Sequence, residues 1–145
     1  MQARISTLET RLLHLGNPHG MPVRVARLAV VDALGEDHPA YENVRLVVSE
    51  LVTNAVRHGP QNGRVALCIR REESDFYIEV ADDGTEHSRP TLHVPSLDEV
   101  DDPAEGGRGL WTVHVLSLGR WGFREQGSLR ERVVWAYIPA HPRRP

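Results

Sequence analysis

A long amphipathic stretch at residues 40–58 places the strongest constraint on the fold of this chain. At helical spacing, six apolar side chains of this stretch fall on one broad face: Val47, Val48, Leu51, Val52, Ala55 and Val56. A helix with such a face has to bury it against a second layer. The next two segments, residues 63–71 and 76–80, alternate apolar and polar residues around a short turn, which predicts antiparallel, half-buried strands. Helix and strands together predict an α+β fold, a two-layer sandwich in which helices cover one face of a mixed, mostly antiparallel sheet.

The rest of the chain extends this pattern. The expected order is strand, helix, helix, strand, strand, helix, strand, strand. The predicted strands occupy residues 5–13, 63–71, 76–80, 121–124 and 129–138, and the predicted helices occupy residues 23–34, 40–58 and 110–118. A polar segment at 84–107, rich in proline and acidic residues, is predicted to be a long loop of the kind that usually carries function. We expect one domain over 1–145, with a core at about 5–139 and a tail at 140–145.

Composition excludes several functional classes. All 17 basic residues are arginine, so a P-loop and a eukaryotic-type kinase site, which both need a lysine, cannot form. The net charge of −3 argues against binding to nucleic acid. No segment has the length and apolarity of a membrane span, and the single Cys68 excludes an internal disulfide. We therefore expect a cytoplasmic protein that binds neither nucleic acid nor a membrane.

Two polar residues stand on the long helix where packing does not require them. Glu50 and Asn54 lie one turn apart at the edge of the apolar face. A carboxylate and a carboxamide in this arrangement suit a general base and a ligand for a hard cation. A solvated helix face with a chance Glu–Asn pair explains the same spacing and, taken alone, is the better explanation. His58, at the end of this helix, is expected to stabilise the helix terminus.

Two further segments hold residues suited to a nucleotide. Asp82 follows the strand at 76–80 and precedes Gly84, so its carboxylate can accept a hydrogen bond from an adenine amino group while the glycine admits the base. Three glycines in residues 106–109 open the next helix, where backbone N–H groups suit phosphate and Arg108 adds a bidentate donor. An Asp-Gly turn and a flexible helix start explain each segment separately. Only the three segments together argue for a nucleotide site.

In order and spacing, the three segments resemble the N, G1 and G2 boxes of the GHKL ATPase and kinase superfamily. The matching residues are Glu50-x-x-x-Asn54, Asp82-x-Gly84 and Gly107-x-Gly109-Leu110. Residues 49–59 (SELVTNAVRHG), with 107–110 and Trp121-Gly122, are more specifically similar to bacterial anti-sigma-factor serine kinases and related actinobacterial ATP-binding regulators. The resemblance covers about residues 5–139 and implies the Bergerat-type ATP-binding fold.

The resemblance implies a role for each matching residue. Glu50 would be the general base, acting on a partner's hydroxyl or on water. Asn54 would bind Mg²⁺ at the phosphates of ATP. Asp82 would accept a hydrogen bond from the adenine amino group, and Gly84 would pack against the base. The ATP site would be completed at the phosphates by Gly107, Arg108 and Gly109, with Leu110 next to them.

The implied cofactors are ATP and Mg²⁺, and the implied partners are a sigma factor and a small STAS-like antagonist of the anti-sigma factor. The antagonist would be phosphorylated on serine or threonine, and a homodimer stays open. A second hypothesis also stays open, in which the chain is a catalytically silent nucleotide-binding interaction module. Glu50 favours the enzyme. Glu86, which stands where the family usually has a second glycine in the G1 box, favours the module.

Overall fold

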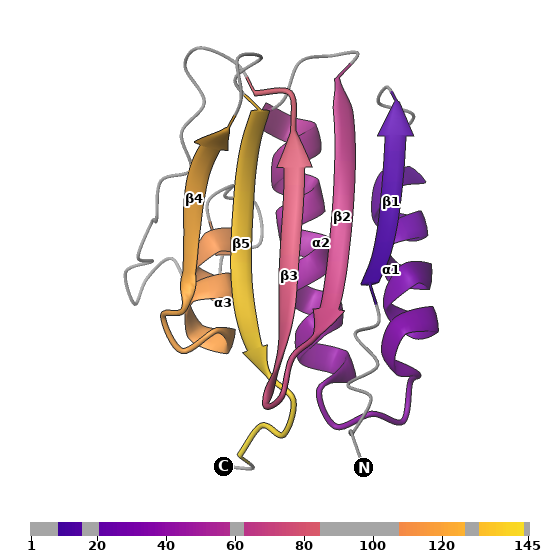
Figure 1. The fold of residues 1–145 in the computed structure, drawn as a ribbon, viewed down its shortest axis with the longest axis vertical. Helices are drawn as coiled ribbons and strands as arrows, with labels where there is room; N and C mark the ends of the chain where they lie inside the picture. Colours follow the sequence, from indigo (N-terminus) through magenta and orange to yellow (C-terminus); the bar gives the residue numbers. More distant parts are fainter. Residues whose placement is uncertain (1–8, 16–20, 59–62, 85–107, 127–130, 144–145) are drawn as a thin grey trace, which may run out of the picture.

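The computed structural model describes residues 9–15, 21–58, 63–84, 108–126 and 131–143, which form one sheet with helices on one of its faces. The elements follow one another in the predicted order. They are β1 (Glu9–Leu15), α1 (Met21–Leu34), α2 (Tyr41–His58), β2 (Arg64–Arg71), β3 (Asp75–Asp82), α3 (Arg108–Leu116), β4 (Trp121–Gln126) and β5 (Glu131–Pro139). Figure 1 views the sheet face-on, with all three helices behind it. The predicted two-layer α+β fold is confirmed.

The strands are arranged in the order β1-β2-β3-β5-β4. Each of the four neighbouring pairs is antiparallel, so the described sheet is antiparallel throughout, where a mixed sheet was expected. The predicted turn between β2 and β3 is tight, and the Glu72 N–H donates to the Asp75 carbonyl at 2.9 Å. At the other end of β3, Asp82 lies opposite Val65 of β2 and Arg132 of β5. The register therefore sets the end of β3 between the starts of its two neighbours.

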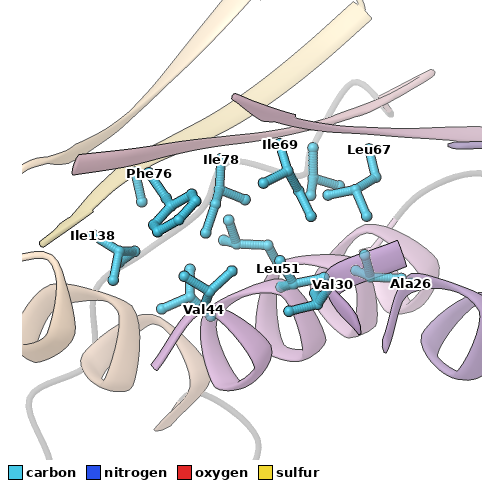
Figure 2. Close-up of a cluster of buried hydrophobic side chains, with 14 of the residues drawn as sticks. Ala26, Val30, Val44, Leu51, Leu67, Ile69, Phe76, Ile78 and Ile138 are labelled. Carbon is cyan, nitrogen blue, oxygen red and sulfur yellow. The ribbon is translucent and has the colours of Figure 1, made fainter. Parts of the chain in front are cut away.

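The core lies between the helices and the sheet. Leu51 of α2 is 2% exposed and Ile78 of β3 is fully buried. Figure 2 shows Val44 and Leu51 on the helix side pointing toward Leu67, Ile69 and Ile78 on the sheet side. Of the six apolar residues predicted to share the α2 face, only Val56 is half-buried, and the other five are buried. The helical periodicity thus identified the buried face of α2.

Element ends differ from the predicted ones where backbone geometry decides them. α3 runs from Arg108 to Leu116, where residues 110–118 were expected. It ends early because Leu118 and Gly119 both have positive φ, and the Gly119 N–H donates to the His114 carbonyl at 2.8 Å. β1 ends at Leu15, beyond the expected 13. Most of the predicted loop at 84–107 lies outside the described residues. Among the residues that are described, no helix is both long and apolar enough to cross a membrane.

Candidate functional site

Glu50 of α2 and Gly109 of α3 lie against each other where the two helices meet. A Cβ atom added at position 109 would overlap Glu50 Oε2, so a glycine there leaves room for the carboxylate. Gly109 is the second residue of α3. The fold thus joins the first and third of the segments that the sequence singled out.

The environment of Glu50 changes its acidity. The side chain is half-buried, and this burial raises the pKa of its carboxyl above the ordinary 4.5. The positive charge of Arg57, further along the same helix, lowers that pKa by a smaller amount. The net direction is upward. A carboxylate that takes up a proton more readily than usual suits the role of a general base.

Asp82, the last residue of β3, is 4% exposed and shapes the turn that follows it. Its Oδ1 accepts a hydrogen bond from the Gly84 N–H at 2.7 Å. Gly84 has a φ of 64°, in the left-handed region that favours glycine. Asp82 and Gly84 are therefore joined by a hydrogen bond. Their roles toward an adenine base stay predictions.

Arg132, near the start of β5, pairs with Asp82 inside the protein. Its Nε and Nη2 both donate to Asp82 Oδ2, at 3.0 and 2.6 Å. The side chains of both partners are 3% exposed. The antiparallel register fixes the pair, because Asp82 and Arg132 are opposite one another on β3 and β5. The predicted adenine-binding residue is therefore already held on one side by a buried guanidinium.

The sequence analysis did not single out Arg132, although a feature of the sequence pointed to it. Residues 132, 134, 136 and 138 alternate along β5, and all four are buried. Three of them are apolar and join the core: Val134, Ala136 and Ile138. Arg132 is the remaining member of this otherwise apolar face, and a buried arginine needs a buried partner. Its partner could not be named without the strand order.

His58, at the end of α2, lies close to this ion pair. Burial lowers the pKa of its imidazole below 6.5, and the charges of Arg132 and Arg57 lower it further, while Asp82 raises it. A helix C-terminus by itself favours the protonated form of histidine. Burial and the two guanidinium groups favour the neutral imidazole, and the predicted stabilisation of the helix end by His58 stays a prediction.

Asn54 follows Glu50 by one turn of α2 and is half-buried. Within the described part of the chain, no three His, Cys, Asp or Glu side chains gather to hold a metal ion. A cation at Asn54 could take the side-chain amide oxygen as one ligand. This fits Mg²⁺, which usually keeps several waters and binds one or two protein ligands plus phosphate oxygens.

The remaining predicted residues fall into two groups. Leu110 is 6% exposed and belongs to the core. Gly107 and Glu86 lie outside the described residues, and of Arg108 only the backbone is described, as the first residue of α3. Among the other histidines, His114 of α3 accepts a hydrogen bond from Trp121 Nε1 at 3.0 Å.

A family model described as a histidine kinase-like ATPase domain matches residues 21–117, which is more than half of the chain. The chain belongs to this family. The match runs from α1 to α3 and includes Glu50, Asp82 and Gly109. The predicted membership of the GHKL superfamily is therefore confirmed for this ATPase domain.

Similar proteins are found among bacterial regulators. The anti-sigma F factor of Clostridium acetobutylicum is 41% identical over 64 residues, 41% of this chain and 45% of that protein. The serine-protein kinase RsbW of Bacillus subtilis is 30% identical over 103 residues, 65% of this chain and 64% of that protein. RsbW of Listeria innocua is 28% identical over 101 residues, 64% of each protein. The chain thus spans between about half and just under two-thirds of the length of these relatives.

Solved structures with a similar backbone arrangement include two histidine kinases. The mycobacterial sensor histidine kinase MprB has a TM-score of 0.45 at 17% identity, over 68% of this chain and 73% of that one. The catalytic domain of histidine kinase ThkA has a TM-score of 0.48 at 14% identity, over 94% of this chain and 97% of that one.

Proposed function

We propose that this ATPase domain binds ATP with Mg²⁺, phosphorylates a serine or threonine of a small STAS-like antagonist protein, and holds a sigma factor on another surface. The contact between Glu50 and Gly109 carries the proposal. It sets a half-buried carboxylate with a raised pKa beside the start of α3, where backbone N–H groups suit phosphate. The names of the relatives, anti-sigma F factor and serine-protein kinase, support the two partner classes.

The proposed phosphoryl transfer needs a proton acceptor and a γ-phosphate held in line with the attacking hydroxyl. As the hydroxyl oxygen of the antagonist bonds to the γ-phosphorus, its proton passes to the Glu50 carboxylate. The bond between the γ-phosphorus and the bridging oxygen breaks, and ADP leaves. Positioning and charge neutralisation supply most of the rate in such reactions. Gly109 contributes by leaving space for the carboxylate.

Mg²⁺, when bound, would neutralise charge on the phosphates. Asn54 is the residue that would hold it, because its amide offers a neutral oxygen one turn beyond Glu50. Asp82 would orient the adenine ring from the end of β3.

The decisive experiment mixes the full chain, γ-labelled ATP, Mg²⁺ and the candidate antagonist encoded nearby, and measures label on the antagonist. Glu50→Gln keeps the size and polarity of the side chain but cannot take up the proton. We expect near-normal affinity for ATP with Mg²⁺ and a transfer rate lower by roughly 10²–10⁴. A Glu50→Gln variant as fast as the parent would show that Glu50 is not the base.

The metal assignment is tested by calorimetry with and without Mg²⁺. Asn54→Ala should remove the part of ATP affinity that depends on Mg²⁺ and leave the fold intact, because Asn54 is only half-buried. The matched control is Thr53→Ala, an exposed neighbour on the same helix, which should bind like the parent. Equal Mg²⁺ dependence in the parent and Asn54→Ala would count against a metal ligand at this position.

The silent-module hypothesis makes a different prediction for the same samples. A module would bind ATP and the sigma factor, yet the parent would transfer no label to any cognate antagonist. Glu86 is the sequence feature that supports this alternative. If the parent transfers label to the antagonist and Glu50→Gln slows that transfer, the silent-module hypothesis is excluded.

A further inference from the structure

We infer that Arg132 determines the base specificity of the nucleotide site by occupying one side of the Asp82 carboxylate. This inference rests on the proposed ATP site. Without Arg132, the Asp82 carboxylate would offer both of its oxygens to a nucleotide base. With Arg132 in place, it offers one remaining acceptor position, which suits adenine and excludes the paired donors of guanine.

The geometry of the carboxylate shows which oxygen is used. Arg132 directs two donors to the same atom, Asp82 Oδ2, at 3.0 and 2.6 Å. The Gly84 N–H takes one position on the other oxygen, Oδ1, at 2.7 Å. A carboxylate has about four lone-pair positions in all. Three described donors therefore leave one position, and it is on Oδ1.

Adenine and guanine present different hydrogen-bond donors to such a carboxylate. Adenine carries one amino group beside an unprotonated ring nitrogen, so it needs a single acceptor. Guanine carries a ring N–H and an amino group side by side, and these two donors fit a carboxylate with both oxygens available. The guanidinium on Oδ2 blocks that bidentate arrangement and adds positive charge next to guanine's donors.

Neither partner can easily give way. Both side chains are 3% exposed, and the β3–β5 register places the two residues opposite each other. Swinging Arg132 aside would break a buried ion pair and remove both donors from Asp82 Oδ2, which is costly. The acceptor pattern is thus built into the sheet. A purely structural ion pair is the rival explanation, and it predicts no change in base preference when Arg132 is replaced.

The test measures affinities of the full chain for ATP and GTP by calorimetry, with Mg²⁺, in the parent and in Arg132→Met. We expect the parent to favour ATP, and Arg132→Met to gain roughly tenfold or more in GTP affinity, the effect of one hydrogen bond to a charged group. Arg120→Met is the matched control. Arg120 pairs with Asp75 at the opposite end of the same strand, at 2.7 and 2.9 Å, and its replacement should leave the ATP-to-GTP ratio unchanged.

A second measurement uses the parent alone, since Arg132→Met could fail to fold. Inosine triphosphate has the ring N–H of GTP but lacks the amino group. If one acceptor position remains, the parent should bind GTP no more tightly than inosine triphosphate. A parent that binds GTP tenfold more tightly than inosine triphosphate overturns the inference, as does a folded Arg132→Met with the parent's ATP-to-GTP ratio. A parent that binds no nucleotide overturns the ATP site itself, and the inference with it.

Discussion

Two carboxylates in this domain sit in contrasting surroundings. Asp82, at the end of β3, is 4% exposed and receives three hydrogen bonds from Arg132 and Gly84. Glu50, in the middle of α2, is half-buried, and its carboxylate occupies the space that a side chain at position 109 would need. Burial acts on both side chains, but only Asp82 has a guanidinium partner within the core.

The contrast separates two kinds of chemistry. A carboxylate held by several donors is fixed in place and suits the acceptance of one more hydrogen bond. A carboxylate whose pKa is raised by burial suits the acceptance of a proton. If Glu50 is the proposed base, the strand end provides the rigid carboxylate and the helix–helix contact provides the proton acceptor. This division is testable because matched substitutions can be made at both positions.

The largest expected difference is in stability. Asp82→Asn and Glu50→Gln each replace a carboxylate by an amide of the same shape. Asp82→Asn removes the carboxylate that accepts two hydrogen bonds from the buried Arg132, and breaking a buried pair in this way costs about 3–5 kcal/mol of unfolding free energy. Glu50→Gln should not lower stability and should raise it slightly at neutral pH, because the amide replaces a charged form that burial disfavours. Urea unfolding of both variants at neutral pH measures the two values.

The sign of the Glu50 effect can be checked by varying pH. The folded pKa of Glu50 is raised, so its carboxyl favours folding below its ordinary pKa of 4.5, and this contribution is lost as pH rises through the raised folded value. Glu50→Gln should therefore gain in stability relative to the parent as pH rises through that window. Equal losses of stability in Asp82→Asn and Glu50→Gln would remove the distinction between the two carboxylates.

The two regions also differ in how far the sequence predicted them. The helical period of α2 and its Glu50–Asn54 spacing are local, so the element and its polar edge followed from the sequence. The Asp82–Arg132 pair joins residues 50 apart in the chain, and it depends on β5 lying beside β3. That strand order is set by the packing of the whole domain. The contact of Glu50 with Gly109 is equally non-local, and the sequence analysis did not predict it. The family resemblance implied only that both residues belong to one ATP site.

A smaller effect is expected when the Glu50 region is crowded. In Gly109→Ala the new Cβ overlaps Glu50 Oε2, which is the end of a flexible side chain. The carboxylate should move and the fold should persist, and a displacement of about 1 Å can lower a rate ~10²-fold. Label transfer to the antagonist measures the loss.

A double-mutant cycle identifies how this loss arises. If Gly109→Ala acts by displacing Glu50, it should add little to the loss already caused by Glu50→Gln. Multiplicative losses in the double variant would instead indicate that Gly109 acts on the phosphates, independently of the carboxylate.

The smallest effect comes from Arg57, which lowers the pKa values of both Glu50 and His58. Arg57→Gln should raise both, because a nearby positive charge disfavours protonation. The acid side of the profile of transfer rate against pH should shift to higher pH. NMR titration of His58 should show a shift in the same direction, and that measurement needs no activity.

Salt and a matched variant sharpen this last test. Arg57 is exposed, so its influence should shrink as the screening length falls from about 30 Å at 0.01 M to about 3 Å at 1 M salt. Arg45→Gln is the control, since Arg45 lies on the same helix and pairs with Glu42 at 3.1 Å. If Arg57→Gln leaves the His58 titration unchanged at low salt, the exposed charges of α2 do not reach the site. Burial would then act on the pKa of Glu50 without an opposing effect of Arg57.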